Sequence, residues 1–367
     1  MSSDHGIVTR RRFLTAAAAS LPLVAAACSV PAQPSATAAA APGAAAKQAP
    51  AQGGKGFVIG GLVKTLGEFW EDSHKAVDAV VKKWGGEVVW QAPTKEDVAK
   101  QREAFEGFIA QGVSGIVFGA SDPGAFNDLV KKAQTSKIPC VTFEADAPPS
   151  GRVLYVGGED YGYGYKAGEA LAKKIGGKGK VAIQQGSATA ANARGRADGM
   201  EAALKKGGCE VVTRDLDGED AGVALTHAEQ LIVTYPDLRG FCGVYADHIA
   251  VAATAVKAAN KVGQIEITGN DPYGKAYDYI KDGTVFCAYH HNNYDMAVTA
   301  AIWVCNAVKF GLEHAYYVAG IDPDKPVADR KLFVRDILLT KENVDAYLSH
   351  FNDLKAGKWG IEYETWV

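Results

Sequence analysis

The stretch Phe57-Val58-Ile59-Gly60-Gly61-Leu62-Val63-Lys64-Thr65-Leu66-Gly67-Glu68-Phe69-Trp70 decides the fold. Its first seven residues are an apolar run of the length of a buried strand, and an amphipathic run follows over 69–84. A polar loop separates the two runs. A strand, a polar loop and a helix in this order predict the start of a parallel sheet whose strands are connected by helices.

The same alternation continues through the rest of the chain. Apolar runs predict strands at 57–63, 87–90, 115–119, 139–143 and 152–156, with helices at 69–84, 96–111 and 124–136. A second block predicts strands at 180–185, 209–213, 240–244 and 264–268, with helices at 163–175, 192–206, 221–234 and 248–261. Strands at 285–289 and 332–338, a helix at 294–310 and a helix beginning at Lys341 follow. These elements predict an α/β fold of two doubly wound parallel-sheet units, between which the chain passes more than once.

Before this folded region, Thr9-Arg10-Arg11-Arg12-Phe13-Leu14 precedes an alanine-rich apolar run that ends at Cys28. A basic start, an apolar middle and small residues before a cleavage point are typical of an export signal, and paired arginines before Phe-Leu indicate the twin-arginine route. We therefore predict that residues 1–27 are a signal. The protein is then expected to work outside the cytoplasm, in the periplasm or on the outer face of the cell membrane.

Two interpretations of Ala25-Ala26-Ala27-Cys28 remain open. The segment is either a lipoprotein processing site, with Cys28 as the lipidated first residue, or a small-residue cleavage site that merely precedes a cysteine. We favour lipidation, because the residues that follow are small and polar and suit a low-complexity linker over 28–56. The apolar run over 13–27 is shorter than the ~18 residues that span a bilayer, so we expect membrane attachment only through the lipid.

Charge and cysteine content limit the function further. The chain carries 39 Lys and Arg against 42 Asp and Glu, a mildly acidic balance that offers no electrostatic basis for binding nucleic acid. Besides Cys28 there is an odd number of cysteines, so at least one is unpaired unless it pairs between chains; they are Cys140, Cys209, Cys242, Cys287 and Cys305. Most lie in apolar, strand-like runs, where we expect small buried thiols. The sequence has no CxxC or Cys/His ligand spacing, so we expect no metal site.

Polar and aromatic side chains follow the predicted strands. In open parallel sheets, ligands bind beyond the carboxyl ends of the strands. The segments at these positions are 64–70, Glu144-Ala145-Asp146, the loop leading to Asn192 and Arg194, Tyr245-Ala246-Asp247, Asn270-Asp271-Pro272-Tyr273 and His290-His291-Asn292-Asn293. A crevice with carboxylates, Arg and Lys, and flat rings suits a sugar, which has hydroxyls around its edge and C–H faces above and below. Taken singly, an Asp or Asn after a strand is equally explained as a turn or helix-cap residue.

The order and spacing of several segments carry a resemblance to a known family; they are Lys64-Thr65-Leu66 with Phe69-Trp70, 141–148, Tyr155-Val156-Gly157-Gly158, 189–199, Tyr235-Pro236-Asp237-Leu238, Gly269-Asn270-Asp271 and 339–344. Over 57–348 the sequence resembles the ribose-type periplasmic sugar-binding proteins, the substrate-capturing component of bacterial sugar ABC transporters. The resemblance implies two Rossmann-like lobes of the periplasmic binding protein type I fold, which close on one monosaccharide. It also implies three crossovers, near Gly158, His291 and Asp324. The lobes are then 57–158 plus 292–324 and 159–291 plus 325–367.

The resemblance also implies binding residues. Phe69 and Trp70 match an aromatic pair that packs against the sugar ring, with Trp70 the stronger candidate because Phe69 also suits the core. Arg194 matches a binding arginine, Asp271 matches a binding aspartate, and His291 falls where a glutamine is common.

One departure from the family pattern follows the fourth predicted strand. Glu144 stands where an aspartate usually precedes an arginine. Ala145 replaces that arginine, so the expected donor is missing and Asp146 is the candidate to take part instead.

A second departure is Ala246, which occupies the position of a binding asparagine and leaves Asp247 or Tyr245 as the replacement. This substitution puts ribose itself in doubt. The candidate pocket charges are Glu68, Glu144, Asp146, Asp247 and Asp271 against Lys64 and Arg194. Buried like charges are expensive unless they are paired, so the ligand should supply many donors and little negative charge. A neutral sugar or polyol fits, an amino sugar fits too, and a sugar phosphate fits poorly.

We therefore predict a monomeric extracytoplasmic solute-binding protein, without a cofactor, that captures a monosaccharide or polyol between two lobes and delivers it to an ABC permease. The alternative is a sugar sensor that presents its closed form to a chemoreceptor or sensor kinase, because both outcomes depend on the same hinge closure. An exported glycoside hydrolase with Glu144 and Asp271 as its carboxylate pair is the less favoured, enzymatic interpretation, because acceptors of sugar hydroxyls need neither shifted acidity nor a placed water.

Overall fold

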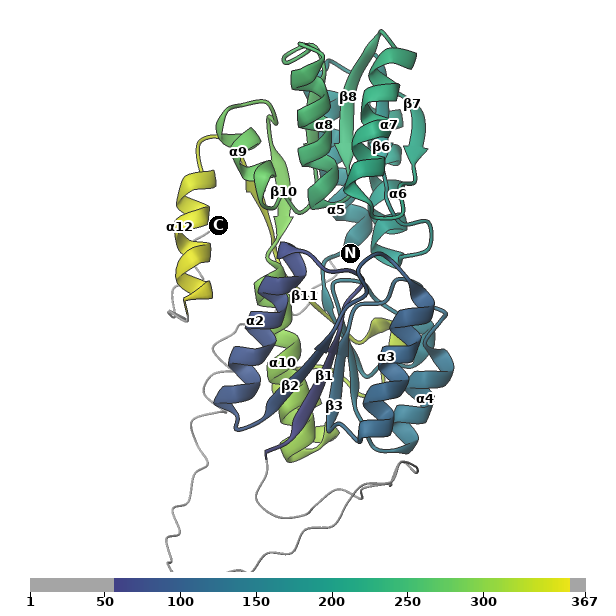
Figure 1. Ribbon diagram of the computed structural model, residues 1–367, viewed down its shortest axis with the longest axis vertical. Helices are drawn as coiled ribbons and strands as arrows, with labels where there is room; N and C mark the ends of the chain where they lie inside the picture. Colours follow the sequence, from purple (N-terminus) through teal and green to yellow (C-terminus); the bar gives the residue numbers. More distant parts are fainter. Residues whose placement is uncertain (1–55, 357–367) are drawn as a thin grey trace, which may run out of the picture.

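The computed structural model describes residues 56–356. In Figure 1 two α/β lobes stand one above the other, with the N-terminal lobe below and the C-terminal lobe above. The predicted signal, Cys28 and the predicted linker up to residue 55 lie outside the described residues. The helices of the described part are all too short or too polar to traverse a bilayer.

The N-terminal lobe is built on a six-stranded parallel sheet. Its strands, in spatial order, are β11 (Lys331–Phe333), β5 (Leu154–Gly157), β4 (Cys140–Phe143), β3 (Gly115–Phe118), β1 (Val58–Leu62) and β2 (Glu87–Gln91). Helices α2 (Glu68–Lys83) and α10 (Asn293–Phe310) pack together on one face, and α3 (Val98–Gln111) and α4 (Asn127–Thr135) cover the other. The central strands β3 and β4 are buried along their whole length because helices lie on both faces.

The C-terminal lobe repeats this architecture on a smaller sheet. Its parallel strands, in spatial order, are β7 (Glu210–Asp215), β6 (Lys180–Gln184), β8 (Leu238–Gly243) and β9 (Glu266–Gly269). Strand β10 (Ala288–His291) continues beside β9 through a bridge between Asn270 and Tyr289, and it pairs antiparallel with β12 (Asp336–Leu339). Helices α5 (Asp160–Lys174) and α6 (Ala191–Lys206) cover one face, and α7 (Ala221–Thr234) and α8 (Ala246–Ala258) cover the other.

The elements agree with the predicted alternation, apart from a few local differences. Two short helices, α9 (Lys275–Lys281) and α11 (Leu312–Ala319), lie where the sequence predicts none. The final helix, α12 (Val344–Lys355), begins three residues after the predicted start at Lys341. It packs against α9 beside the C-terminal lobe, and two short 3₁₀ turns, η1 (Pro148–Ser150) and η2 (Val327–Asp329), complete the described chain.

The chain crosses between the lobes at three places. The first crossing follows β5 at Gly158 and the second follows β10 at Asn292, close to the predicted positions. The third lies at 334–335 and not near Asp324, because β11 still pairs with β5 in the N-terminal lobe while β12 pairs with β10 in the C-terminal lobe. The apolar run over 332–338 is therefore two short strands in different sheets. Lobe boundaries move accordingly, with 325–333 belonging to the N-terminal lobe.

Polar anchors explain why the chain crosses so late. The buried guanidinium of Arg152 donates hydrogen bonds to the carbonyl oxygens of Val327 and Arg330, which ties the segment before β11 to the N-terminal lobe. On the other side of the crossing, Lys166 of α5 forms an ion pair of 2.9 Å with Asp336 at the start of β12. The two anchors belong to different lobes, so the switch falls between them.

The five described cysteines are all free and buried, which confirms the expectation of buried thiols. Burial raises the pKa of the Cys287 thiol to about 11, so this thiol stays protonated at neutral pH. The cysteines therefore serve as small apolar side chains of the core.

The closest helix contact in the described chain joins α5 and α6. Gly164 of α5 lies directly against the backbone of Arg196, and Gly199 of α6 lies directly against the backbone of Tyr161, so that a Cβ at either position would overlap a carbonyl oxygen. Only glycine permits this approach. The contact fixes the position of Arg196, whose side chain extends toward the space between the lobes.

We predict that Gly164→Ala lowers the free energy of unfolding by about 1–3 kcal/mol, because the added methyl must push α5 and α6 apart. Urea denaturation followed by circular dichroism measures the change. Gly107→Ala is the matched control in α3, where an added Cβ would come no closer than 3.8 Å to Gln111 Nε2. There alanine should leave stability unchanged or raise it by up to about 1 kcal/mol. Equal effects of the two substitutions would contradict the packing argument.

Candidate functional site

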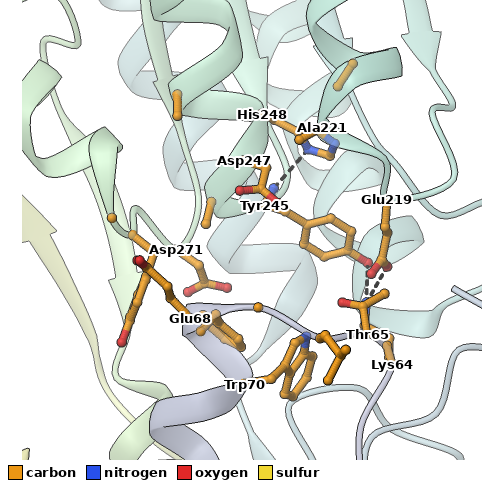
Figure 2. A pocket seen from close by; sticks show the side chains of 18 of the residues that line it. Lys64, Thr65, Glu68, Trp70, Glu219, Ala221, Tyr245, Asp247, His248 and Asp271 are labelled. Atoms are coloured by element: carbon orange, nitrogen blue, oxygen red, sulfur yellow. Dashed lines mark hydrogen bonds and ion pairs between the residues drawn. The ribbon is translucent and has the colours of Figure 1, made fainter. Parts of the chain in front are cut away.

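A pocket of about 290 Å³ lies between the lobes, lined by loops at the carboxyl ends of strands from both sheets (Figure 2). The N-terminal lobe contributes the loop between β1 and α2 together with Thr94 and Glu144. The C-terminal lobe contributes the loop after β7, the start of α8 and the loop between β9 and α9. The lining includes these residues predicted from the sequence: Lys64, Glu68, Phe69, Trp70, Glu144, Asp247 and Asp271.

An aromatic wall forms the side of the pocket that belongs to the N-terminal lobe. Trp70, in the first turn of α2, is 7% exposed and packs edge-on against Phe69 and Phe143 with ring centroids 5.0 and 5.9 Å apart. Phe69 in turn packs against Tyr273 of the C-terminal lobe at 5.8 Å. Trp70 is therefore held rigidly, with part of its ring system facing the pocket (Figure 2).

Three acidic residues of the pocket have a left-handed backbone conformation, which residues other than glycine rarely adopt. They are Glu144, Glu219 and Asp271, with φ of 60°, 59° and 53°. Such a conformation costs on the order of 1–3 kcal/mol and persists only where the surroundings enforce it. The hydroxyl of Tyr155 donates to the carbonyl oxygen of Glu144 at 3.0 Å, and the amide of Asp271 donates to the carbonyl oxygen of Tyr289 at 2.7 Å. These hydrogen bonds hold the backbone of Glu144 and Asp271 in the strained conformation, which is common at functional sites.

The buried guanidinium of Arg196 lies behind the pocket and joins the lobes. It forms ion pairs with Glu144 of the N-terminal lobe at 3.1 Å and with Asp271 of the C-terminal lobe at 2.7 Å. Its Nε donates to Asp160, at the start of α5, at 3.0 Å. Two of its partners line the pocket, so Arg196 orients the carboxylates that a ligand would meet.

This arrangement corrects the prediction for Arg194, which is exposed and does not line the pocket. Both arginines lie in α6, where each residue turns by about 100°, so positions 194 and 196 point to opposite sides. The buried side of α6 includes Asn192, Ala193, Arg196 and Ala197. The apolar residues Ala193, Ala197 and Met200 recur with the period of a helix, and this signal in the sequence places Arg196 on the buried side.

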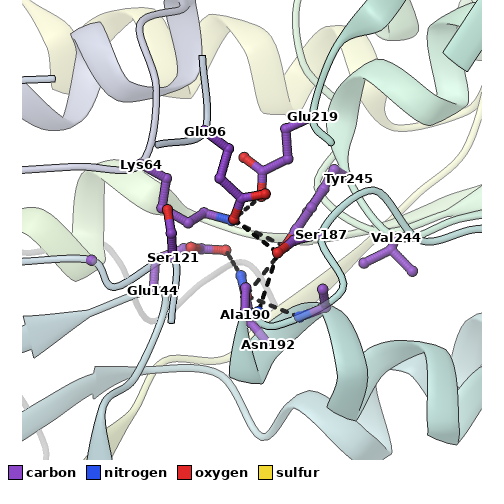
Figure 3. Close-up of polar contacts among 12 residues, drawn as sticks. Lys64, Glu96, Ser121, Glu144, Ser187, Ala190, Asn192, Glu219, Val244 and Tyr245 are labelled. Atoms are coloured by element: carbon purple, nitrogen blue, oxygen red, sulfur yellow. Dashed lines mark hydrogen bonds and ion pairs between the residues drawn. The ribbon is translucent and has the colours of Figure 1, made fainter. Parts of the chain in front are cut away.

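Glu144 is the most informative of the predicted acids. Its carboxylate is almost fully buried, and Oε1 accepts a hydrogen bond from Asn192 Nδ2 at 2.6 Å (Figure 3). The same oxygen accepts a second hydrogen bond from Arg196 at 3.1 Å. Oε2 has no hydrogen-bond partner among the described residues. A buried carboxylate oxygen in the pocket wall with no donor leaves room for a donor supplied by a ligand.

Asp271 is held from several sides. Its Oδ1 accepts hydrogen bonds from the hydroxyl of Tyr163 at 2.8 Å and from the amide of His291 at 3.0 Å. Together with the ion pair to Arg196, these bonds fix the carboxylate at the end of β9. Asp271 thereby occupies the position in the cleft that the sequence predicts.

Asp146 does not take part in the pocket, contrary to the prediction. Both of its carboxylate oxygens accept hydrogen bonds of 2.7 Å from Arg152, and the hydroxyl of Thr142 donates another at 2.7 Å. All of these hydrogen bonds lie within the N-terminal lobe, so the carboxylate is not available to a ligand. Nothing in the local sequence indicates that Arg152, six residues further on, turns back to pair with it.

His291 does not line the pocket either. Its ring stacks on Tyr163 with centroids 3.5 Å apart and covers Gly158, so it lies where the first two crossings run side by side. Burial and the neighbouring charge of Arg196 lower the pKa of His291 well below its usual value, so the ring is neutral at physiological pH. His291 is a packing residue of the hinge.

Lys64 is a buried cation that contacts the opposite lobe. Its ammonium forms an ion pair with Glu219 at 2.6 Å and donates to the hydroxyl of Tyr245 at 3.0 Å (Figure 3). Burial opposes its charge, but Glu219 and Tyr245 outweigh that effect and raise the pKa of Lys64. Glu219 is not among the residues predicted from the sequence, although the polar turn Asp217-Gly218-Glu219-Asp220, in which it lies, follows β7.

Further contacts join the lobes on both flanks of the pocket. On one flank Ser187 donates to Glu96 at 2.8 Å, and Lys95 pairs with Asp220 at 2.6 Å. On the other flank the hydroxyl of Tyr273 donates to Asp72 of α2. The two lobes therefore touch around the pocket, and Glu68 and Asp247 form its exposed mouth.

No group of His, Cys, Asp and Glu within the described range could hold a metal ion. His248, which lines the pocket, is instead bonded within the C-terminal lobe. Its Nδ1 accepts from the amide of Tyr245 at 3.2 Å, and its Nε2 donates to Asp217 at 2.9 Å. With Nδ1 acting as an acceptor, this ring carries no charge.

A family model described as the periplasmic binding protein domain matches residues 59–312. The chain therefore belongs to the periplasmic binding proteins, and its fold is the type I fold of that family.

Individual relatives are distant. A D-ribose/D-allose-binding protein of Pseudomonas aeruginosa is 27% identical over 195 residues, which cover 52% of this chain and 61% of that protein. The chain thus spans about three fifths of the length of this relative. A xylitol-binding protein of Mycolicibacterium smegmatis is 24% identical over 80% of this chain and 79% of its own length. A solute-binding protein of Burkholderia graminis, solved in complex with D-arabinose, matches 80% of this chain and 98% of its own with a TM-score of 0.73 at 22% identity, which shows the shared fold.

We predict that Arg196→Ala lowers the free energy of unfolding by about 3–5 kcal/mol, because it leaves buried carboxylates without their counter-charge. Arg194→Ala, its neighbour on the exposed side of α6, should change stability by less than about 0.5 kcal/mol. Urea denaturation of the two variants and the parent protein measures both values. A large effect at Arg194 with a small one at Arg196 would reverse our assignment of the two arginines.

Proposed function

We propose that this protein is an extracytoplasmic solute-binding protein that captures a monosaccharide or polyol between its lobes and delivers it to an ABC importer. The observation that carries the proposal is the pocket between the lobes, where a fixed tryptophan faces buried carboxylates held by an arginine. Membership of the periplasmic binding proteins and the sugar-binding relatives support it.

The chemistry of the lining favours a polyhydroxy molecule. Carboxylates such as Glu144 and Asp271 accept hydrogen bonds from hydroxyls, and the ring of Trp70 offers an apolar surface to C–H groups. The volume of about 290 Å³ suits one sugar ring better than an oligosaccharide. A phosphate or carboxylate group on the ligand would lie next to like charges, so acidic sugars should be excluded.

Ligand binding should favour the closed arrangement of the lobes. The pocket walls come from both lobes, with Trp70 and Glu144 on one side and Asp271 on the other. A molecule that contacts both sides binds the closed form better than an open one, and this difference in affinity shifts the equilibrium toward closure. The three crossings of the chain form the hinge about which the lobes would move.

The proposal extends to the location of the protein and its assembly. We infer export by the twin-arginine signal over 1–27, attachment by lipid at Cys28, and action as a monomer beside a permease. We also infer that the protein releases its ligand chemically unchanged, so the glycoside-hydrolase interpretation is not favoured. The sensor alternative remains a prediction, and the genes beside this one would distinguish it from transport.

We predict that a thermal-shift screen, followed by calorimetric titration, identifies a ligand among neutral monosaccharides, polyols and amino sugars. Binding of such a ligand raises the melting temperature by mass action, because only the folded protein has the pocket. Uronic acids and sugar phosphates serve as matched negative controls of the same size. A protein that bound only an acidic sugar would overturn the proposal.

We predict that the ligand found in this screen changes the tryptophan fluorescence, and that the change is lost in Trp70→Phe. Trp70 lines the pocket, so contact with the ligand alters the surroundings of its indole. Phenylalanine keeps an aromatic ring at the position, so the variant should still bind, more weakly by up to about 1 kcal/mol. Trp84→Phe, outside the pocket, is the control that should retain the fluorescence change.

A further inference from the structure

Carboxylates outnumber cations in the pocket. The lining holds six carboxylates and two ammonium groups: Glu68, Glu144, Asp217, Glu219, Asp247 and Asp271 against Lys64 and Lys275. Lys64 is already paired with Glu219. His248, the partner of Asp217, contributes no charge in the tautomer that its hydrogen bonds define. The pocket therefore presents an excess of negative charge to whatever enters it.

The excess is greatest at the buried end. Three carboxylates, those of Glu144, Asp160 and Asp271, share the single guanidinium of Arg196 at 3.1, 3.0 and 2.7 Å. Burial, together with the nearby charges of Glu144 and Asp271, raises the pKa of Asp160 to about 7 despite its bond to Arg196. Even with Asp160 partly protonated near neutral pH, the single charge of Arg196 faces the two buried carboxylates of Glu144 and Asp271, and such an imbalance is costly in a poorly solvated site.

A second, independent observation points to where a ligand would relieve this imbalance. Glu144 Oε2 is buried in the pocket wall and has no hydrogen-bond partner among the described residues, although Oε1 of the same carboxylate has two. The resemblance described above places an arginine directly after this acidic residue, and here the position is the buried Ala145. Among the described pocket residues, Glu144 Oε2 is thus a buried carboxylate oxygen with no donor, and the residue that follows Glu144 supplies none.

We propose that the ligand supplies this cation: it is an amino sugar or amino polyol whose protonated primary amine binds Glu144. This inference rests on the proposed function and narrows it. An ammonium group offers three hydrogen-bond donors and one positive charge, which match the free Oε2 and the surplus of negative charge around Arg196. The hydroxyls of the same molecule bind the remaining carboxylates, and its C–H face packs on Trp70.

Calorimetric titration with matched pairs of ligands tests the inference. The pairs are D-glucosamine with D-glucose, D-galactosamine with D-galactose, and 1-amino-1-deoxysorbitol with sorbitol, all at a pH at which the amines are protonated. In at least one pair the amine should bind about tenfold or more tightly than its neutral partner, the difference that one charge-assisted hydrogen bond provides. Neutral partners that bind as tightly as the amines would overturn this inference and leave the proposed function standing. A protein that bound neither member of any pair, nor any other sugar or polyol, would overturn both.

The substitution Glu144→Gln tests whether the ligand's amine binds at Glu144. The amide is nearly isosteric with the carboxylate and keeps an oxygen for Asn192, but it removes the charge. The variant should lose most of the preference for the amine, leaving a ratio below about threefold, because the NH2 group that takes the place of Oε2 is a donor and cannot accept from the ammonium. Glu103→Gln, on the exposed side of α3, is the control that should retain the full ratio. A melting curve of each variant verifies that it is folded, and an unchanged preference in folded Glu144→Gln would exclude Glu144 as the amine partner.

Discussion

The buried guanidinium of Arg196 is the interaction on which the rest of the structure depends. It reaches the N-terminal lobe through Glu144 and the C-terminal lobe through Asp160 and Asp271. Each of these carboxylates would be costly to bury alone, and within the described residues none has another cation as near. The closed arrangement of the lobes and the charge state of the pocket are therefore two consequences of one ionic cluster. A change at any member alters both.

The backbone around this cluster is shaped to hold it. Glycines let α5 and α6 approach until their backbones touch, which places Arg196 below the cleft and Tyr163 against Asp271. Glu144 and Asp271 leave their strands through left-handed turns, which direct both carboxylates toward the guanidinium. The strain in these turns is sustained because the packed α/β lobes support them. Each half of the site is therefore held rigidly by its own lobe, whether or not the lobes move relative to each other.

The sequence predicts the elements of the fold well because strands buried on both faces and amphipathic helices have clear periods. It predicts the third crossing poorly, because the apolar run over 332–338 continues through the point where the chain changes lobe, and the anchors at Arg152 and Lys166 are distant in sequence. The same limit applies to the site. Glu144, Asp271 and Trp70 follow strands and could be found by position. The helical period of α6 is enough to distinguish Arg196 from Arg194, whereas the pairing of Asp146 with Arg152 is a tertiary property that the sequence does not show.

The charges in the cleft also indicate which residues contribute to closure of the lobes and which can select the ligand. The contacts on the flanks, such as Lys95 with Asp220, are exposed ion pairs, which typically contribute only about 0–1 kcal/mol each. Lys64 and Glu219 neutralise each other across the lobes and add little net charge to the pocket. Neither set of contacts distinguishes one small polar ligand from another. Selectivity must then come from the groups that are buried and incompletely satisfied, and Glu144 combines both properties. A ligand able to satisfy that carboxylate gains more from closure than one of equal size that cannot, since only differential interaction with the closed form shifts the equilibrium between the lobes.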